Sequence, residues 1–212
     1  MKELREVINN YYNERNAENY DNNRRWRTYL KNTYDLALRL DEPRKGDIIL
    51  DVPIGTGGLS CKLANLIGNS GRLYGVDLSG AMLKKAKDKL KYYDNVLLLE
   101  NRIDNTHYKQ GSFNKIFCLN SLHHFKDPGD FIGKCFNLLK RNGLLIVIDF
   151  DRSYISMSLA EIIFKFNQTH ARSYRREETE GLLVENGFKI KKAVSEKPGL
   201  FWGYYGIVGE KI

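Results

Sequence analysis

Short apolar runs alternate with amphipathic segments from Asp47 onward, and this alternation constrains the fold more than any other feature. The runs read DIILDV, RLYGVD, NVLLLE, KIFCLN and GLLIVIDF. Near-continuous apolar runs of this length are typical of strands buried on both faces of a parallel sheet. The segments between them carry helical spacing, as at Leu63, Leu66 and Ile67. Repeated strand–helix units predict an α/β fold, a Rossmann-like three-layer sandwich.

The pattern changes after residue 150. An insertion of roughly residues 151–176, rich in aromatic residues and containing His170, precedes a helix expected at about 177–186 and closed by Gly187. Two strand-like stretches, FKIKKAV and WGYYGIVGEK, follow with a Pro-Gly turn signal between them. Because the connection is short, the two strands should pair antiparallel. The sequence therefore predicts a seven-stranded, mostly parallel sheet with an antiparallel C-terminal strand pair.

The chain is expected to form one domain over residues 1–212. Residues 1–45 carry two helical stripes and predict an N-terminal helical cap, with the Asn-rich segment NAENYDNN between them as a loop or frayed helix. Residues 46–150 form the cofactor-binding core. Residues 151–212 add the substrate-cap insertion and the terminal strands.

Composition narrows the class of protein further. The 34 Lys and Arg residues exceed the 26 Asp and Glu residues, but the two signs are mixed along the chain. No apolar stretch approaches the roughly 18 residues of a membrane span, and the charged start lacks the apolar core of a signal peptide. We therefore expect a cytoplasmic protein without a membrane partner. Cys61, Cys118 and Cys135 lie too far apart to suggest metal ligands, so no metal is predicted.

The segment Ile48–Ser60 carries the strongest functional signal. An apolar strand ends in Asp51, and a loop with Gly55 and Gly57 leads into a helix. Glycine at these positions lets the backbone adopt positive φ and approach a ligand closely. The next strand ends in Asp77, where a carboxylate can accept hydrogen bonds from both hydroxyls of a ribose. Together the loop and the acid predict a nucleoside ligand across the ends of the first two strands.

The charge of Asp51 discriminates between nucleoside cofactors. The segment Gly55–Ser60 nearly fits a nicotinamide-binding fingerprint, but a carboxylate so close to the loop would crowd a pyrophosphate. S-adenosylmethionine has no phosphate and carries a sulfonium and an ammonium group, so Asp51 favours that cofactor. A phosphate-binding P-loop is excluded, because no Gly-Lys-Ser/Thr follows the glycines. A nicotinamide-dependent oxidoreductase stays open as an alternative.

From about Tyr20 to the C-terminus, the chain resembles the class I S-adenosylmethionine-dependent methyltransferases of the small-molecule branch. The resemblance rests on five motifs in the family's order: LDVPIGTGG, GVDLSGAML, FNKIFCLNSLHHFKDP, LLKRNGLLIVIDF and RREETEGLLVENGFKI. One departure is Pro53, which stands where the family usually has its first glycine. Because proline fixes φ and removes an N–H, we expect an altered cofactor affinity.

The resemblance implies cofactor-binding roles for residues of each motif. Asp51 would lie near the methionine ammonium of S-adenosylmethionine, and the carbonyl of Asn120 would bind that group. Tyr20 would cover the sulfonium, where its ring gains a cation–π attraction, and Arg27 would pair with the carboxylate. The remaining implied contacts are the loop residues Pro53, Gly55 and Gly57, Asp77 at the ribose, and Leu78, Met82, Arg102 and Ile103 around the adenine.

The acceptor side is less determined by the sequence. After the fourth strand, His124 is the candidate to take a proton from a hydroxyl or amine acceptor, with His123 packing beside it. The aromatic insertion would help to wall a pocket for a small molecule, and Trp202, Tyr204 and Tyr205 would either add to that wall or fill the face of the sheet. Nucleic acid is not expected, because the segment from Asn120 to His123 lacks the Pro-Pro-aromatic motif of base-amino methyltransferases. An RNA- or protein-directed enzyme, a cofactor-binding module without catalysis and a homodimer remain open.

Overall fold

A seven-stranded sheet forms the centre of the computed structural model, which describes residues 2–154, 171–197 and 203–212. Its strand order is β3-β2-β1-β4-β5-β7-β6. The strands β1 to β5 run parallel, and β7 runs antiparallel to both β5 and β6. The predicted sheet is therefore confirmed. The strands are β1 (Ile48–Asp51), β2 (Arg72–Asp77), β3 (Val96–Glu100), β4 (Phe113–Leu119), β5 (Leu139–Phe150), β6 (Phe188–Glu196) and β7 (Tyr204–Lys211).

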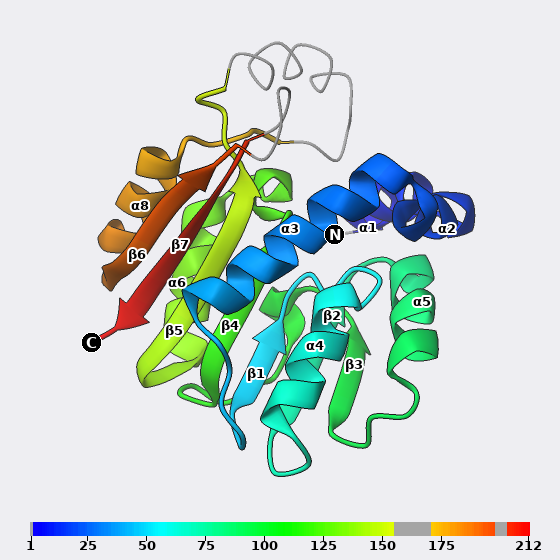
Figure 1. Cartoon of the computed structure of the whole chain (residues 1–212), viewed down its shortest axis with the longest axis horizontal. Helices are drawn as coiled ribbons and strands as arrows, with labels where there is room; N and C mark the ends of the chain where they lie inside the picture. The colour runs from blue at the N-terminus through cyan, green and yellow to red at the C-terminus, as the bar shows by residue number, and fades with distance from the viewer. Residues whose placement is uncertain (1, 155–170, 198–202) are drawn as a thin grey trace.

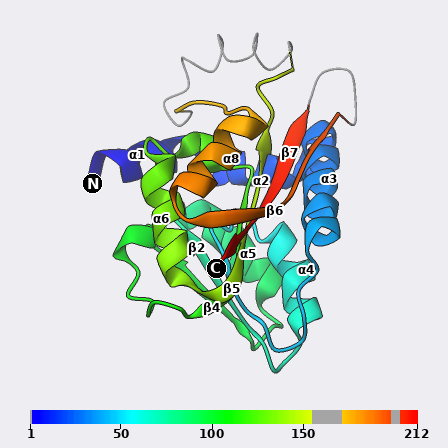
Figure 2. The ribbon, with the colours of Figure 1, turned by 90° about the vertical axis from the view of Figure 1, so that its left-hand side faces the viewer.

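Helices cover both faces of this sheet and make the three layers visible in Figures 1 and 2. The described helices are α1 (Lys2–Tyr11), α2 (Glu14–Asn22), α3 (Arg24–Leu40), α4 (Gly58–Ile67), α5 (Gly80–Leu90), α6 (Pro128–Leu138) and α8 (Arg176–Glu185), with short 3₁₀ turns η1 (Ile103–Asn105) and η2 (Leu122–His124). One face packs against α3, α4 and α5, and the other against α6 and α8. In β1, β4 and β5, successive residues alternate between the two cores, which explains their near-continuous apolar runs. The expectation of burial on both faces is wrong for the edge strand β3, where Leu97 is 50% and Leu99 39% exposed.

Parallel strands bring their carboxyl ends to one edge of the sheet. Asp51 ends β1, Asp77 ends β2 and Asn120 follows β4. Because β1 pairs with both β2 and β4, these three positions are neighbours in space. Ligands of open α/β sheets bind in the crevice outside such strand ends.

The Asn-rich N-terminal segment, expected to be a loop or a frayed helix, lies in helix α2 up to Asn22. Asn13 caps the start of α2 by accepting a hydrogen bond from the amide of Asn16. Asn23 ends α2 and also begins α3, where its side chain accepts from the amides of Arg25 and Trp26. Asparagine is favoured at such caps, because its side chain satisfies amides that the helix leaves unpaired.

The helix after the insertion agrees with the sequence, since α8 begins at Arg176 and Gly187 follows it with φ of 90°. Most of the insertion, including His170, lies outside the described residues, as does Trp202. Among the helices that the structure does describe, none combines the length and the apolar character needed to cross a membrane.

Candidate active site

The loop after β1 uses its two glycines for different purposes. Gly55 and Gly57 have φ of 57° and 76°, in the left-handed region that favours glycine. A Cβ atom on Gly57 would lie 3.2 Å from Ala86, so this glycine allows α4 and α5 to pack closely. A Cβ atom on Gly55 would meet nothing within 4 Å. Gly55 therefore leaves an open space beside its backbone.

Asp77 is held at the tip of β2 by backbone amides. Its Oδ2 accepts from the amide of Gly55 at 2.8 Å, and its Oδ1 accepts from the amide of Ser79 at 2.8 Å. Burial raises the pKa of this carboxyl to about 6, although the amides of Ser79 and Gly55 favour the charged form. The side chain is oriented without any ligand, and each oxygen keeps a lone pair for a further donor.

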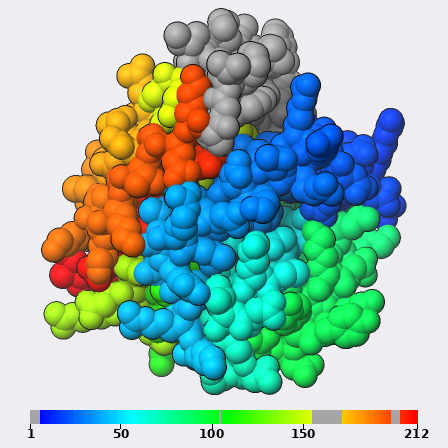
Figure 3. All heavy atoms as spheres, in the orientation of Figure 1, coloured from blue at the N-terminus to red at the C-terminus, as the bar shows by residue number. Residues whose placement is uncertain are grey.

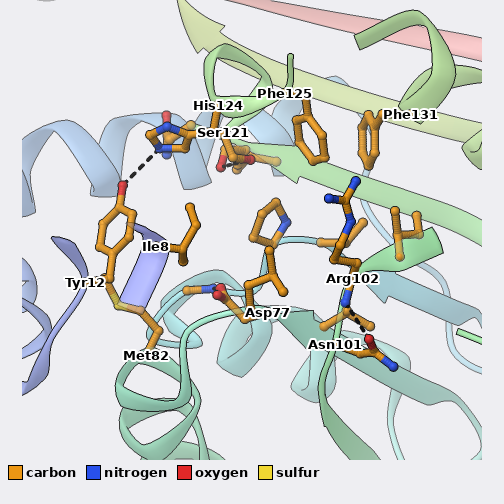
Figure 4. A pocket seen from close by; sticks show the side chains of 18 of the residues that line it. Ile8, Tyr12, Asp77, Met82, Asn101, Arg102, Ser121, His124, Phe125 and Phe131 are labelled. Atoms are coloured by element: carbon orange, nitrogen blue, oxygen red, sulfur yellow. Dashed lines mark hydrogen bonds between the residues drawn. The ribbon is translucent and has the colours of Figure 1, made fainter. Parts of the chain in front are cut away.

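A cavity of about 280 Å³ opens beside Asp77 at the carboxyl ends of the strands. Figure 4 shows it between Tyr12 and His124 at one end and Arg102, Phe125 and Phe131 at the other. Most of the residues singled out from the sequence line it together: Tyr20, Pro53, Gly55, Asp77, Leu78, Met82, Arg102, Ile103, Asn120 and His124.

Three predicted site residues do not line this cavity. Asp51 is buried and turned toward α4, where its Oδ2 accepts from the hydroxyl of Ser60 at 2.6 Å. Burial raises the pKa of Asp51 to about 7, and the nearby charge of Asp77 adds to this effect. Gly57 caps α4 behind the loop, and Arg27 lies on the exposed surface of α3. These three residues are therefore not among those that line the cavity.

Asn120 adopts a left-handed backbone conformation with φ of 54°, which asparagine tolerates better than most residues. Its side chain is engaged by α3: Oδ1 accepts from Tyr29 Oη at 2.9 Å, and Nδ2 donates to Thr33 Oγ1 at 3.1 Å. The buried amide therefore fixes the turn after β4, while Asn120 itself borders the cavity.

His124 meets a residue that sequence reasoning missed. Tyr12 Oη lies 2.9 Å from His124 Nε2, and both side chains line the cavity. Burial raises the pKa of Tyr12 well above its usual value, so the hydroxyl stays neutral and forms one hydrogen bond with Nε2. Leu4, Val7, Ile8 and Tyr11 form one helical stripe in the sequence, which omits Tyr12, yet Tyr11 is 43% exposed. Tyr12 follows the last residue of α1, so its side chain does not obey the helical spacing of that stripe.

His123 supports the cavity from behind. Its Nδ1 lies 2.7 Å from Asp149 Oδ1, and its amide donates to Asp149 Oδ2 at 3.0 Å. Burial by itself would raise the pKa of Asp149, but the contacts with His123 hold it below its usual value. The rings of His123 and His124 lie 4.0 Å apart between centroids. His123 thus ties η2 to the end of β5 and packs against the candidate catalytic ring.

Other lining residues also escaped the sequence reasoning. Ile8 of α1, Ser121, Phe125 and Phe131 border the cavity, and the two phenylalanine rings stack at 4.1 Å. Phe125 directly follows His123 and His124 in the sequence, and this position could have indicated that it borders the cavity. Within the described ranges, no group of three His, Cys, Asp or Glu side chains is arranged to hold a metal ion.

Known proteins resemble this chain in sequence and in fold. Residues 43–191 match the methyltransferase domain family. A ubiquinone/menaquinone biosynthesis C-methyltransferase of Klebsiella pneumoniae is 28% identical over 115 residues, which cover 53% of this chain and 46% of that protein. The match thus spans about half the length of such curated relatives.

Solved structures share the fold at low identity. A SAM dependent methyltransferase from Aquifex aeolicus superposes with a TM-score of 0.69 at 18% identity, covering 84% of this chain and 89% of that one. The cyclase SpnF reaches 0.72 at 17% identity, covering 88% of this chain and 83% of its own. Since one of these proteins is named as a cyclase, the fold alone does not define the reaction.

The chain belongs to the methyltransferase domain family, whose match extends over more than half of its residues. The resemblance to class I S-adenosylmethionine-dependent methyltransferases is thereby confirmed, and with it S-adenosylmethionine as the cofactor. The cavity fits this cofactor: Asp77 offers a carboxylate at the cavity wall, Gly55 leaves room beside its backbone, and Leu78 provides an apolar surface.

Proposed function

We propose that the protein transfers a methyl group from S-adenosylmethionine to an oxygen or nitrogen nucleophile of a small molecule. The observation that carries this proposal is the carboxylate of Asp77, fixed by the amides of Gly55 and Ser79 at the wall of an otherwise largely apolar cavity. A preorganised carboxylate of this kind suits the two hydroxyls of a ribose. The family match supports the class of reaction.

Each part of the cavity has a role toward the cofactor. Asp77 binds the ribose, and Leu78, Met82 and Ile103 pack against the adenine. The carbonyl of Asn120 accepts from the ammonium group. Asp51 acts at longer range: its pKa is raised to about 7, and its charged form behind the loop disfavours a phosphate there. When bound, S-adenosylmethionine supplies an electrophilic methyl group on a positively charged sulfur.

Two effects act on the methyl acceptor: proton uptake by His124 and alignment of the acceptor with the methyl group. The neutral imidazole of His124 can take the proton that an O–H or N–H acceptor loses, and at Nε2 the acceptor would replace the hydroxyl of Tyr12, which lies 2.9 Å away. Holding the acceptor in line with the methyl group lowers the activation barrier more than proton transfer does, because positioning alone can account for about 7–11 kcal/mol of a barrier. Arg27 has no role in this scheme, since it lies on the surface away from the cavity.

A small molecule suits the cavity better than a nucleic acid does. The space of about 280 Å³ is enclosed partly by Ile8 and the stacked Phe125 and Phe131. The lysine-rich helix α5 next to it is not an open basic track, because its Lys84 and Lys89 pair with acids of α2. Helix α5 therefore offers fewer lysines to the phosphates of a nucleic acid, whose binding depends on such contacts.

A carbon acceptor is the second candidate, favoured by the name of the curated relatives as C-methyltransferases. A ring carbon becomes nucleophilic when a neighbouring hydroxyl loses its proton, so His124 would serve the same purpose. The site geometry is common to both candidates, and the identity of the methylated atom distinguishes them.

Calorimetry with S-adenosylmethionine and S-adenosylhomocysteine tests the cofactor, with NADH as the control ligand. We expect micromolar binding of the first two and none of NADH. Hydroxylated and amine-bearing small molecules are then screened with S-adenosylmethionine, and the product mass and its NMR spectrum identify the methylated atom. Binding of NADH instead, or tight RNA binding that weakens steeply with salt, would contradict the proposal.

A further inference from the structure

Helix α2 is attached to the core by Ala17 and Tyr20 and by a row of ion pairs. Ala17 is the only residue of α2 that is buried. Helices α2 and α5 lie side by side (Figures 1 and 3). Three acids of α2 pair with three lysines of α5. The pairs are Glu14–Lys84 at 2.9 Å, Glu18–Lys85 at 3.5 Å and Asp21–Lys89 at 2.6 Å. Exposed ion pairs of this kind are weak and sensitive to salt.

Asp21 differs from the other two acids because it also holds the glycine loop. Its Oδ1 accepts from the hydroxyl of Thr56 at 2.9 Å, and Lys89 Nζ donates to the same hydroxyl at 3.0 Å. Thr56 is only 1% exposed and stands between Gly55 and Gly57. Asp21, Thr56 and Lys89 thus form a closed triangle that joins α2 to the loop after β1.

Both ends of this link border the cavity. On the cap side, Tyr20 precedes Asp21 and lines the cavity together with Tyr12 and Ile8. On the core side, Gly55 precedes Thr56, lines the cavity and donates its amide to Asp77. A ligand that fixes the loop at Gly55 therefore also fixes the hydroxyl that Asp21 binds.

We infer that Asp21 is a positioning residue that couples occupation of the cofactor cavity to docking of the cap formed by α1 and α2. The inference rests on the proposed function, because it requires that the cavity beside Gly55 binds the nucleoside. Ligand binding stabilises the Thr56–Asp21 contact, and this contact holds Tyr20 and Tyr12 over the cavity. Since coupling is reciprocal, a docked cap raises the affinity for the ligand. Tyr20 and Tyr12 over the cavity also slow its release.

Hydrogen–deuterium exchange with S-adenosylhomocysteine as the probe tests this coupling. In the wild-type protein, we expect the ligand to protect the amides of residues 6–22. In Thr56→Val, that protection should be lost, and the ligand should dissociate about fivefold faster in stopped-flow measurements. Asp21→Asn keeps an oxygen that can accept from Thr56 but loses the charge that pairs with Lys89, so protection and dissociation should lie between those of the wild type and Thr56→Val. Thr56→Ser keeps a hydroxyl and should retain the wild-type behaviour.

Asp35→Asn is the matched control. Asp35 lies on α3 and forms an exposed ion pair with Lys31 at 2.6 Å, but it does not border the cavity. This variant should keep both the protection and the wild-type dissociation rate. A general loss of stability would change the exchange of the whole chain, whereas loss of coupling is confined to α1 and α2 and appears only as a difference between free and bound protein.

Several outcomes would overturn the inference. Wild-type protection and dissociation rates in both Asp21→Asn and Thr56→Val would remove Asp21 from the coupling. If Asp21→Asn does not fold, the comparison of Thr56→Val with Thr56→Ser decides. If the wild-type protein binds no S-adenosylhomocysteine, the proposed function fails and the coupling with it. The anchoring of α2 alone is then judged by whether ligand-free Asp21→Asn exchanges faster than wild type over residues 14–22.

Discussion

The amide of Gly55 donates to the Oδ2 of Asp77 at 2.8 Å, and this bond joins the loop after β1 to the tip of β2. The two residues belong to different motifs of the sequence, yet one orients the other. The carboxylate is therefore in place before a ligand arrives, and binding need not order it. Preorganisation of this kind raises affinity by lowering the entropy lost on binding.

Replacement of Asp77 should weaken the binding of S-adenosylhomocysteine at least about tenfold, equivalent to about 1.4 kcal/mol. Asp77→Asn keeps the volume, but its amide nitrogen would face a backbone N–H that now donates to a carboxylate oxygen. Calorimetry measures the change, with Asp94→Asn as a control at an exposed aspartate. Wild-type affinity in Asp77→Asn would exclude Asp77 from the site.

The affinity for S-adenosylhomocysteine should also depend on pH. The pKa of Asp77 is raised to about 6 by burial, and only the charged carboxylate accepts from both ribose hydroxyls. Binding should therefore be constant above about pH 7 and weaken as the pH falls below 6, approaching tenfold per pH unit. Calorimetry at several pH values would show this slope in the wild type and its loss in Asp77→Asn. A slope that persists in the variant would assign the proton to another group.

Asp51 should make the ligand-free protein more stable in mildly acidic solution than at pH 8. Burial raises the pKa of Asp51 from 3.8 to about 7, so the folded state binds a proton that the unfolded state does not bind between these values. Stability should rise as the pH falls from 8 through 7, because protonation relieves the buried charge.

Asp51→Asn removes that charge and should be more stable than the wild type at pH 8, by up to about 4 kcal/mol. The difference should shrink toward pH 5, and urea unfolding at the two pH values measures it. The carbonyl oxygen of the new side chain can still accept from the hydroxyl of Ser60. A variant that is less stable than the wild type at both pH values would show that the charged form is favoured in the fold.

The strand ends were predictable from the sequence because each acid directly follows an apolar run. Strand periodicity fixes where a run ends, and parallel pairing brings the ends together, so Asp77 and Asn120 could be placed beside one ligand. The direction of a side chain at a strand end does not follow from these rules. Asp51 turns toward Ser60 and away from the cavity, a choice set by the packing of α4 that the local sequence does not contain.

The N-terminal cap was harder to predict for a related reason. Helix α2 has little apolar periodicity, and it depends on asparagine caps and on lysines of α5 that lie more than sixty residues later. Tyr12 reaches the cavity because the chain leaves the helix after Tyr11, and its carbonyl accepts from the hydroxyl of Ser79 at 2.9 Å. Long-range contacts of this kind become visible only in the folded chain.

Gly57→Ala should destabilise the protein by about 1–3 kcal/mol. An alanine there would have to adopt the left-handed backbone conformation at φ of 76°, which is unfavourable for a residue with a Cβ. Its Cβ would also lie 3.2 Å from Ala86. Gly181→Ala is the control, since a Cβ at this helical position meets nothing within 4 Å. That change should stabilise α8 by about 0.5–1 kcal/mol. Thermal unfolding measures the stability of both variants, and equal changes in stability for Gly57→Ala and Gly181→Ala would contradict the packing argument.

His124→Gln should lower the rate of methyl transfer by about 10²–10³, measured with the acceptor identified in the screen. Tyr12→Phe removes one hydrogen bond to His124 and should lower the rate less, by about tenfold. Both variants should bind S-adenosylhomocysteine with nearly wild-type affinity, because the ribose is held by Asp77. His107→Gln changes an exposed histidine and serves as the control. A full rate in His124→Gln would mean that the acceptor loses its proton to another group, and the role of Tyr12 would then be limited to closing the cavity.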